Sequence, residues 1–167
     1  MQLNYLNILS FILPFLLASS SFATQSSCPE HFLNGQAPDI VKEKLSIKSR
    51  EVCYSGYGVL HSGVTRTAIY SAEHLTSAKL AQGKGLKRQG KIHSDEHIPA
   101  SERAELHHYA RSGFDRGHVA PSGDMFDLQS QQESFSLANM VPQEPSINRG
   151  VLGENRILCS TNGEDQG

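Results

Sequence analysis

The chain has 167 residues, with 15 Lys and Arg against 17 Asp and Glu, which gives a formal net charge of −2 at pH 7. A protein that coats nucleic acid by general attraction is strongly positive, so this balance excludes that class and leaves open a local cationic cleft. Residues 24–167 are long enough for one domain with its own hydrophobic core.

The first 23 residues are predicted to be a signal peptide. An apolar run from Leu6 to Leu17 is followed by small residues ending in Ser21-Phe22-Ala23, which is typical of a signal-peptidase site. No Lys or Arg precedes the run, so a buried N-terminal helix is the alternative. The run is too short to span a bilayer. We expect an exported protein, periplasmic or secreted, with no membrane association after cleavage.

Three cysteines bear on this expectation. Cys28 and Cys53 would lie in an oxidising compartment, where they can pair, and the sequence leaves open whether they do. Cys159 is then left over, and an odd thiol in an exported protein is notable.

The first half of the remaining chain is predicted from composition and turn residues. Residues 24–50 are polar and contain Pro and Gly, which indicates an irregular arm. The next segment is rich in β-branched and aromatic residues, and we predict a hairpin of Val52–Leu60 with Thr65–Ser71. Residues 72–82 are predicted to form a short helix, and residues 86–101 an extended loop.

Three further elements are predicted before the C-terminal region. A helix starts at Ser101 and covers Glu102 to Tyr109. The polar segment from Asp127 to Ser134 is predicted to be a surface helix, and Phe135–Val141 a strand.

One stretch of the chain is locally cationic. Five basic residues fall within thirteen positions that contain no Asp or Glu: Lys79, Lys84, Lys87, Arg88 and Lys91. A solvated surface and a substrate-binding surface both remain open for the lysines. Gly83-Lys84-Gly85 is not a phosphate-binding P-loop, because the Gly-Lys-Ser/Thr ending is missing.

The most informative stretch is Asp115-Arg116-Gly117-His118. The Arg116 guanidinium presents a rigid fork of donors suited to phosphate, and His118 can move a proton near neutral pH. Gly117 lets backbone or ligand approach closely. Together the four residues indicate phosphate chemistry.

This stretch lies within Tyr109 to Met125, a segment that resembles the DNA/RNA non-specific endonuclease family, which includes mitochondrial endonuclease G and secreted bacterial nucleases. A second block, Phe135 to Gln143 followed by Asn148-Arg149-Gly150, resembles the same family. The similarity covers roughly residues 68–151.

A weaker upstream segment fits as well. Arg88 and Asp95 match the Arg-x-x-x-aromatic-x-x-Asp pattern of the family, with Ile92 at the aromatic position. The resemblance implies an α+β fold of the ββα-metal (His-Me finger) type. In that fold His118 lies on the first strand, the second strand is near Phe135–Val141, and Asn148 begins the helix.

The resemblance also implies roles for individual residues. His118 is the general base that takes a proton from water, and Asn148 is the ligand of a divalent cation, Mg²⁺ or an alternative such as Mn²⁺. Arg88 contacts phosphate. Asp115 and Arg116 orient the site and its water network.

Some of these residues could instead have a purely structural role. His118 could be a structural histidine, Asn148 a helix cap, and Arg116 a structural ion-pair partner. Asn139 is expected to serve the fold by hydrogen bonding rather than to bind metal.

Zinc is a weaker alternative for other histidines. His93 and His97 have i,i+4 spacing and His107-His108 lie nearby. The HExxH pattern is absent and Pro99 argues against a continuing helix, so we do not expect zinc.

After Val151 the sequence departs from the family pattern. Leu152 stands where Trp is expected and Arg156 where Glu is expected. If Leu152 is encoded TTG, a reading frame shifted by one nucleotide permits Trp-Gly-Lys-Ile-Glu, which restores both positions. We therefore expect residues 152–167 to be a divergent, out-of-frame tail. A Leu152 codon other than TTG would contradict this form of the hypothesis.

A truncated domain would have consequences for packing and activity. Loss of covering strands would leave Val119, Phe135, Leu137 and Met140 poorly buried, and stability margins of ~5–15 kcal/mol are easily exhausted. We expect such a chain to cleave nucleic acid less well than a frame-restored version.

The sequence thus predicts a signal peptide at 1–23, an arm at 24–50, the N-terminal part of a nuclease domain at 51–151 and the tail at 152–167. The expected function is an exported, Mg²⁺-dependent endonuclease that acts on DNA and RNA. The alternative is a weak or inactive remnant that at most binds nucleic acid.

Overall fold

A computed structural model of the protein describes residues 24–151. The predicted signal peptide, the predicted tail and Cys159 lie outside the described residues. No helix between residues 24 and 151 combines the length and the apolar character needed to cross a bilayer.

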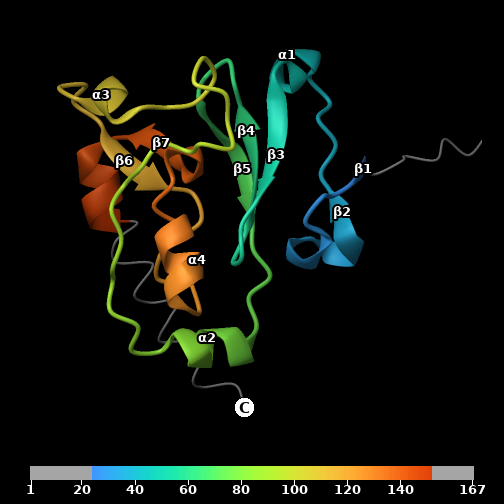
Figure 1. Ribbon diagram of the computed structural model, residues 1–167, viewed down its shortest axis with the longest axis vertical. Helices are drawn as coiled ribbons and strands as arrows, with labels where there is room; N and C mark the ends of the chain where they lie inside the picture. The colour runs from blue at the N-terminus through green and yellow to red at the C-terminus, as the bar shows by residue number, and fades with distance from the viewer. Residues whose placement is uncertain (1–23, 152–167) are drawn as a thin grey trace, which may run out of the picture.

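The described chain has mixed helix and sheet, as predicted for the α+β class. A three-stranded antiparallel sheet contains β3 (Ser49–Cys53), β4 (Gly58–Ser62) and β5 (Thr67–Ala72) in that order. Figure 1 shows this sheet at the centre of the molecule, with the short β1–β2 pair on one side and the β6–β7 pair on the other. The β6–β7 pair carries the predicted site.

Segments 24–50 are more regular than an irregular arm. They contain β1 (Thr24–Gln25), paired with β2 (Gln36–Ala37), and α1 (Glu43–Ser46). Two single 3-10 turns, η1 (Pro29–His31) and η2 (Leu33–Gly35), connect β1 to β2. Short pairings of this kind leave no clear periodicity in the sequence, which is why composition did not reveal them.

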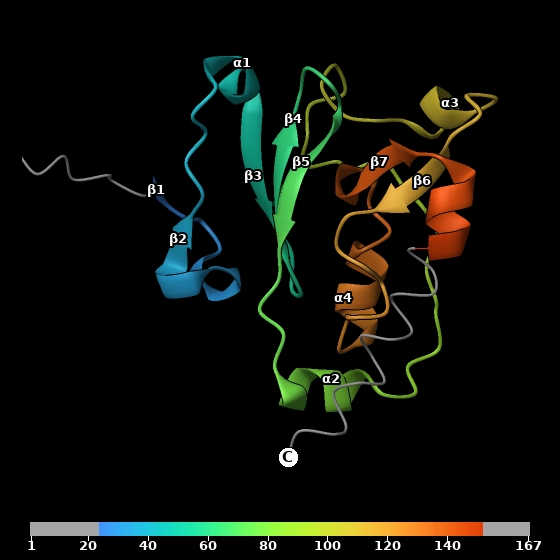
Figure 2. The same cartoon turned by 180° about the vertical axis from the view of Figure 1, so that it is seen from behind.

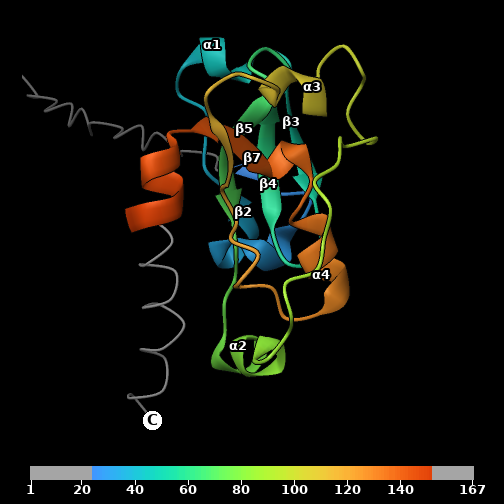
Figure 3. The ribbon, with the colours of Figure 1, turned by 90° about the vertical axis from the view of Figure 1, so that its left-hand side faces the viewer.

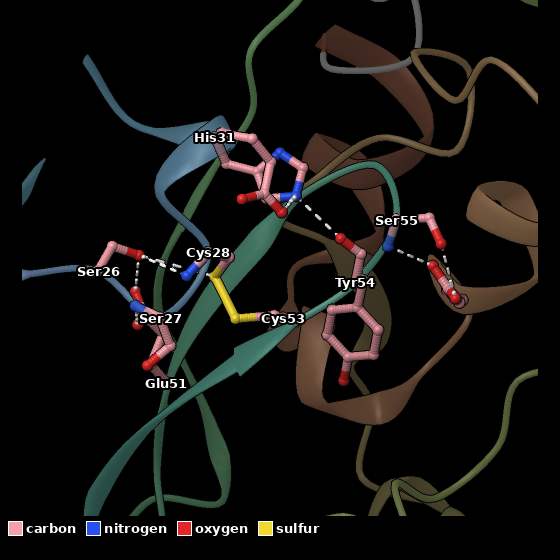
Figure 4. The surroundings of a disulfide bond; sticks show 10 residues. Ser26, Ser27, Cys28, His31, Glu51, Cys53, Tyr54 and Ser55 are labelled. Atoms are coloured by element: carbon pink, nitrogen blue, oxygen red, sulfur yellow. Dashed lines mark hydrogen bonds and ion pairs between the residues drawn. A yellow bond between two sulfur atoms is a disulfide. The ribbon is translucent and has the colours of Figure 1, made fainter. Parts of the chain in front are cut away.

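A disulfide fastens this N-terminal part to the central sheet. Cys28 and Cys53 are joined, with their Cα atoms 5.6 Å apart, and Cys53 is the last residue of β3. Figure 4 shows Glu51 beside the bond, where it accepts hydrogen bonds from the Ser26 hydroxyl at 2.7 Å and the Ser27 amide at 2.6 Å. The pairing that the sequence left open is therefore formed.

The predicted hairpin is confirmed where β4 pairs with β5, but its predicted first strand is wrong. Val52–Leu60 is not one strand, because a tight turn separates β3 from β4. The Tyr54 amide donates to the Tyr57 carbonyl at 2.9 Å across that turn, and the two tyrosine rings stack with centroids 4.6 Å apart. β4 then pairs with β5, close to the predicted partner Thr65–Ser71.

Two predicted helices start later than expected. α2 (Ser77–Gly83) begins after Thr76, whose side chain accepts from the Lys79 amide, while Ala72 still belongs to β5. α3 (Leu106–Tyr109) begins after Glu105, because Pro99 first organises a separate turn by accepting from the Glu102 and Arg103 amides. The predicted extended loop at 86–101 is confirmed, apart from one isolated bridge to Ser136.

The region after β6 (Asp115–His118) combines a confirmed and a wrong prediction. α4 (Leu128–Glu133) is capped by Asp127, which accepts from the Ser130 amide at 2.7 Å, although Ser130 and Gln131 are buried rather than on the surface. Phe135–Val141 is not one strand. Ser136 caps a 3-10 turn, η3 (Leu137–Asn139), so β7 is Met140–Gln143.

The apolar residues around the predicted site are well covered. Phe135 is 5% exposed, and Leu137 and Met140 are 0% exposed, so the expectation of poor burial is wrong for these three; Val119 is half-buried. Ala104 packs with them, and Ile92 and Tyr109 lie against the cluster. Residues from the 86–109 segment thus supply the cover that the sequence did not reveal.

Candidate active site

β6 and β7 pair antiparallel and set the frame of the site. Asp115 lies opposite Gln143, and His118 lies opposite Met140. Side chains alternate between the two faces of a strand, so His118 shares a face with Met140, and Asp115 shares the other face with Gln143. The chain then turns at Pro145 into η4 (Ile147–Val151), which carries Asn148. Figure 3 shows η4 and α4 on opposite sides, with β7 between them.

On one face, His118 is positioned by an aromatic ring. Its imidazole meets the Phe135 ring at 90°, with centroids 5.2 Å apart. The guanidinium carbon of Arg88 lies 5.1 Å from the centroid of the same ring. Phe135 therefore joins the predicted base to the predicted phosphate-binding arginine. Phe135 was predicted to lie in a strand of the second motif block, but its contact with Arg88 could not be predicted because the two residues are 47 positions apart in the chain.

The other face is held by charge. Arg149 donates to both carboxylate oxygens of Asp115, from Nε at 2.7 Å and from Nη2 at 2.6 Å, and Asn148 Nδ2 donates to Asp115 Oδ2 at 3.1 Å. The hydrogen bonds from Arg149 and then Asn148 lower the pKa of Asp115 to about 2. Asp115 is thus ionised at neutral pH and fastens η4 to β6. The two elements lie side by side in Figure 2.

The donors on this face fit a hard divalent cation. A carboxylate can only accept hydrogen bonds, so Asp115 binds the Nδ2 group of the Asn148 amide. The Oδ1 atom of Asn148 is then left for another partner. Gln143 Oε1 is buried and has no hydrogen-bond partner among the described residues. Amide oxygens are ligands of Mg²⁺ or of its bound water. Gln143 was not predicted as a site residue, although it lies in the second motif block.

Gly117 is required by the same arrangement. A Cβ on Gly117 would lie 2.1 Å from Gln143 Oε1 and 2.8 Å from Gln143 Cβ. The close approach expected at this glycine is therefore made by the Gln143 side chain.

Asn139 fixes the backbone that follows His118, as expected for a residue that serves the fold. Its Oδ1 accepts from the Ala120 amide at 2.8 Å, and its Nδ2 donates to the carbonyls of Ala120 and Ser134 at 2.9 and 3.0 Å. The Asn139 carbonyl also accepts from the Val119 amide at 2.9 Å. Asn139 is fully buried. These bonds tie the end of β6 to the start of β7.

Arg116 is exposed on β6, on the same face as His118. No carboxylate between residues 24 and 151 lies within ion-pair distance of it, whereas the neighbouring Asp115 pairs with Arg149. The alternative that Arg116 is a structural ion-pair partner is therefore not what the described chain shows.

Asp95, in the weaker motif segment, belongs to the core and not to the exposed site. It accepts hydrogen bonds from the Tyr54 hydroxyl, from Ser136 Oγ at 2.7 Å and from the His97 amide at 2.9 Å. Burial alone would raise the pKa of Asp95, but these hydrogen bonds lower it on balance. Asp95 therefore anchors the 93–97 segment to Ser136, next to Phe135.

The described residues give no support to a zinc site at His93 and His97. His93 Nδ1 is hydrogen-bonded to the Lys91 carbonyl at 3.0 Å, and His97 Nδ1 is hydrogen-bonded to Asp95 Oδ1 at 3.0 Å. Within residues 24–151, the one cluster with metal-ligand character is Cys28, Glu51 and Cys53, where the disulfide already uses both sulfurs.

The antiparallel β6–β7 pair is followed by a short helix, with a histidine at the end of the first strand and an asparagine on the helix. This is the arrangement of the ββα-metal fold. A sequence-family profile described as DNA/RNA non-specific endonuclease matches residues 36–157. The chain belongs to the DNA/RNA non-specific endonuclease family.

Individual relatives agree with this family. A nuclease of Syncephalastrum racemosum is 45% identical over 93 residues, which is 53% of this chain and 28% of that protein. The human mitochondrial nuclease EXOG is 28% identical over 153 residues, or 86% of this chain and 41% of that protein. The crystal structure of an EndoG/EndoGI complex superimposes with a TM-score of 0.61 at 28% identity, over 66% of this chain and 46% of that one.

The chain spans less than half the length of each of these relatives. A Nostoc sp. nuclease, 30% identical over 131 residues, is likewise covered to 47% of its length.

Proposed function

We propose that this protein is an exported, Mg²⁺-dependent endonuclease that hydrolyses phosphodiester bonds in DNA and RNA with little sequence preference. The observation that carries the proposal is the contact of Asp115 with Asn148 and Arg149, at the base of the strand that ends in His118. It orients an amide oxygen for a cation within a unit that also presents a base. Membership in a family of non-specific nucleases supports the same reaction.

The residues divide the chemistry between them. In the proposed reaction His118 accepts a proton from the attacking water, and Phe135 holds its ring in place. Arg88 and Arg116 contact phosphate oxygens, which positions a strand without reading its bases. Asn148 would hold the divalent cation, with Gln143 toward its water shell; the cation, when bound, stabilises the charge that develops on the phosphate.

Export is part of the proposal and has its own support. The Cys28–Cys53 disulfide is of the kind that persists in an oxidising compartment, in agreement with the signal peptide predicted from the sequence. Mn²⁺ is the alternative cation, because it accepts the same oxygen ligands.

The test is cleavage of supercoiled plasmid and of a structured RNA by the purified protein, with Mg²⁺, with Mn²⁺ and with EDTA. We expect cleavage with Mg²⁺, none with EDTA, and a loss of at least about 100-fold in His118→Ala, since a positioned general base contributes 10²–10⁴-fold. Asn148→Ala is expected to need far more Mg²⁺. His107→Ala is the matched control, because His107 is an exposed histidine on α3.

Two results would contradict the proposal. Cleavage that survives both EDTA and His118→Ala would show that another site, or a contaminant, does the chemistry. Binding of nucleic acid without metal-dependent cleavage would instead establish the alternative, a fragment that only binds.

A further inference from the structure

The loop that carries Arg88 also lines a recess whose residues have no role in the cleavage step proposed above. The recess has a volume of about 500 Å³ and is lined by Gln89, Gly90, Lys91, His93 and Gln132. Its lining includes a cation and two side-chain amides but no carboxylate. We propose that this recess binds a second phosphate of the nucleic acid strand, beside the phosphate that is cleaved. The inference rests on the proposed function and extends it to a named subsite.

The loop is fixed in place at several points. The Gln89 amide donates to the buried Gln131 side chain at 2.6 Å. The His93 amide donates to the Phe135 carbonyl at 3.2 Å, and the Leu137 amide donates to the His93 carbonyl at 2.8 Å. Backbone contacts on both sides of Lys91 thus hold the recess open without a ligand. A fixed site loses less entropy on binding than a mobile loop would.

Gly90 shows how closely this loop lies on the site. A Cβ on Gly90 would lie 2.2 Å from Cδ2 of Phe135, so only glycine lets the backbone rest on that ring. The same ring contacts Arg88 and His118. Phe135 therefore fixes the position of the recess relative to His118.

The electrostatics of the recess suit an anion. Residues 79–91 contain no Asp or Glu. Within residues 24–151, no carboxylate lies within ion-pair distance of Lys87 or Lys91. Glu133, the one acidic residue of α4, accepts a hydrogen bond from the Ser55 amide at 2.7 Å. Lys91 is exposed, and the side-chain amides of Gln89 and Gln132 line the recess with it.

The experiment measures binding of a single-stranded oligonucleotide by the non-cleaving His118→Ala protein at several salt concentrations. We expect Lys91→Ala, in that background, to reduce the slope of log K against log salt by about 0.7, the amount expected for one phosphate contact on a single strand. Lys44→Ala, an exposed lysine on α1, is the matched control and should leave the slope unchanged. An equal effect of both substitutions, or none from Lys91→Ala, would overturn the subsite.

A second arm uses substrate length in the cleaving protein. Lys91→Ala should raise KM for a ten-nucleotide strand and leave cleavage of a dinucleoside monophosphate unchanged, because that substrate has no second phosphate. An equal loss on both substrates would overturn the proposal. If the wild-type protein binds but does not cleave, the proposed function fails, and the salt measurement still decides on the subsite. Absence of binding would overturn both.

Discussion

On one face of β6, His118 rests against the ring of Phe135 within a buried apolar cluster, whereas on the other face Asp115 holds Asn148 and Arg149 through hydrogen bonds and charge. The two groups lie three residues apart in one strand. The first is positioned by packing and the second by a carboxylate.

The difference between the two faces determines which substitutions each face can tolerate. The packing of the Phe135 ring in its apolar cluster does not depend on charge, but it is sensitive to a change of side-chain shape. The Asp115–Arg149 pair lies at the surface, with the Arg149 side chain 72% exposed, so it adds little to the free energy of unfolding. Its value is the orientation it gives to the Asn148 amide. Substitutions on the two faces should therefore fail in different ways.

Among substitutions that separate the two faces, the largest effect is expected from Asp115→Asn. The new amide has no charge and places an NH2 group where one carboxylate oxygen accepted from Arg149, so the Asn148 oxygen is held less firmly. We expect a loss of about 10- to 100-fold in cleavage at limiting Mg²⁺, the range for partners that orient metal ligands. Initial rates over a Mg²⁺ titration measure this, and the half-saturating concentration should rise.

Glu96→Gln is the control for that substitution, because Glu96 is an exposed acid outside the site. If Asp115→Asn lowered the rate equally at all Mg²⁺ concentrations, the carboxylate would act on the chemistry and not on the metal ligand, and the contrast between the faces would need revision.

A smaller effect is expected from Phe135→Leu. Leucine keeps most of the apolar volume but removes the ring that both Arg88 and His118 contact. Contacts of these kinds are each worth about 1 kcal/mol, so we expect a loss of about 10-fold in kcat/KM that Mg²⁺ does not rescue. Phe135→Tyr should restore most of it. In a double-mutant cycle, Phe135→Leu and Arg88→Ala should be less than additive.

Phe126→Leu is a matched control for this prediction. Lys79 lies 5.3 Å from the Phe126 ring, so the same kind of cation contact is removed away from His118. An equal loss in both variants would mean that Phe135 acts on stability alone.

The sequence predicted the parts of the site that local patterns encode. The polar segment from Asp127 to Ser134 was predicted to be a helix, and in the structure Asp127 caps that helix by accepting from the Ser130 amide. The Asp-Arg-Gly-His stretch likewise identified His118 and Asp115 without any structure. The roles of those residues in cleavage stay predictions, since their positions alone do not test them.

Contacts between distant segments could not be predicted in this way. The contact between Arg88 and Phe135 depends on where the 86–101 loop crosses the molecule, and the turn at Tyr54–Tyr57 depends on ring stacking within a buried core. Strand propensity favoured one strand over 135–141, but the cap at Ser136 and the backbone bonds to His93 outweighed it. Local propensity yields where tertiary contacts compete with it.

The smallest effect is a change of stability with pH, and it tests whether charge holds the Asp115 face. The pKa of Asp115 is lowered from 3.8 to about 2, so its folded-state contribution is present above pH 3.8 and is lost as the pH falls through about 2. The free energy of urea unfolding of the wild-type protein, minus that of Asp115→Asn, should be constant from pH 7 to pH 4 and shrink below that. The Phe135→Leu difference should stay flat over the same range, because no ionisable group is removed. A wild-type-minus-Asp115→Asn difference that does not change between pH 4 and pH 2 would show that packing, not charge, holds η4 against β6.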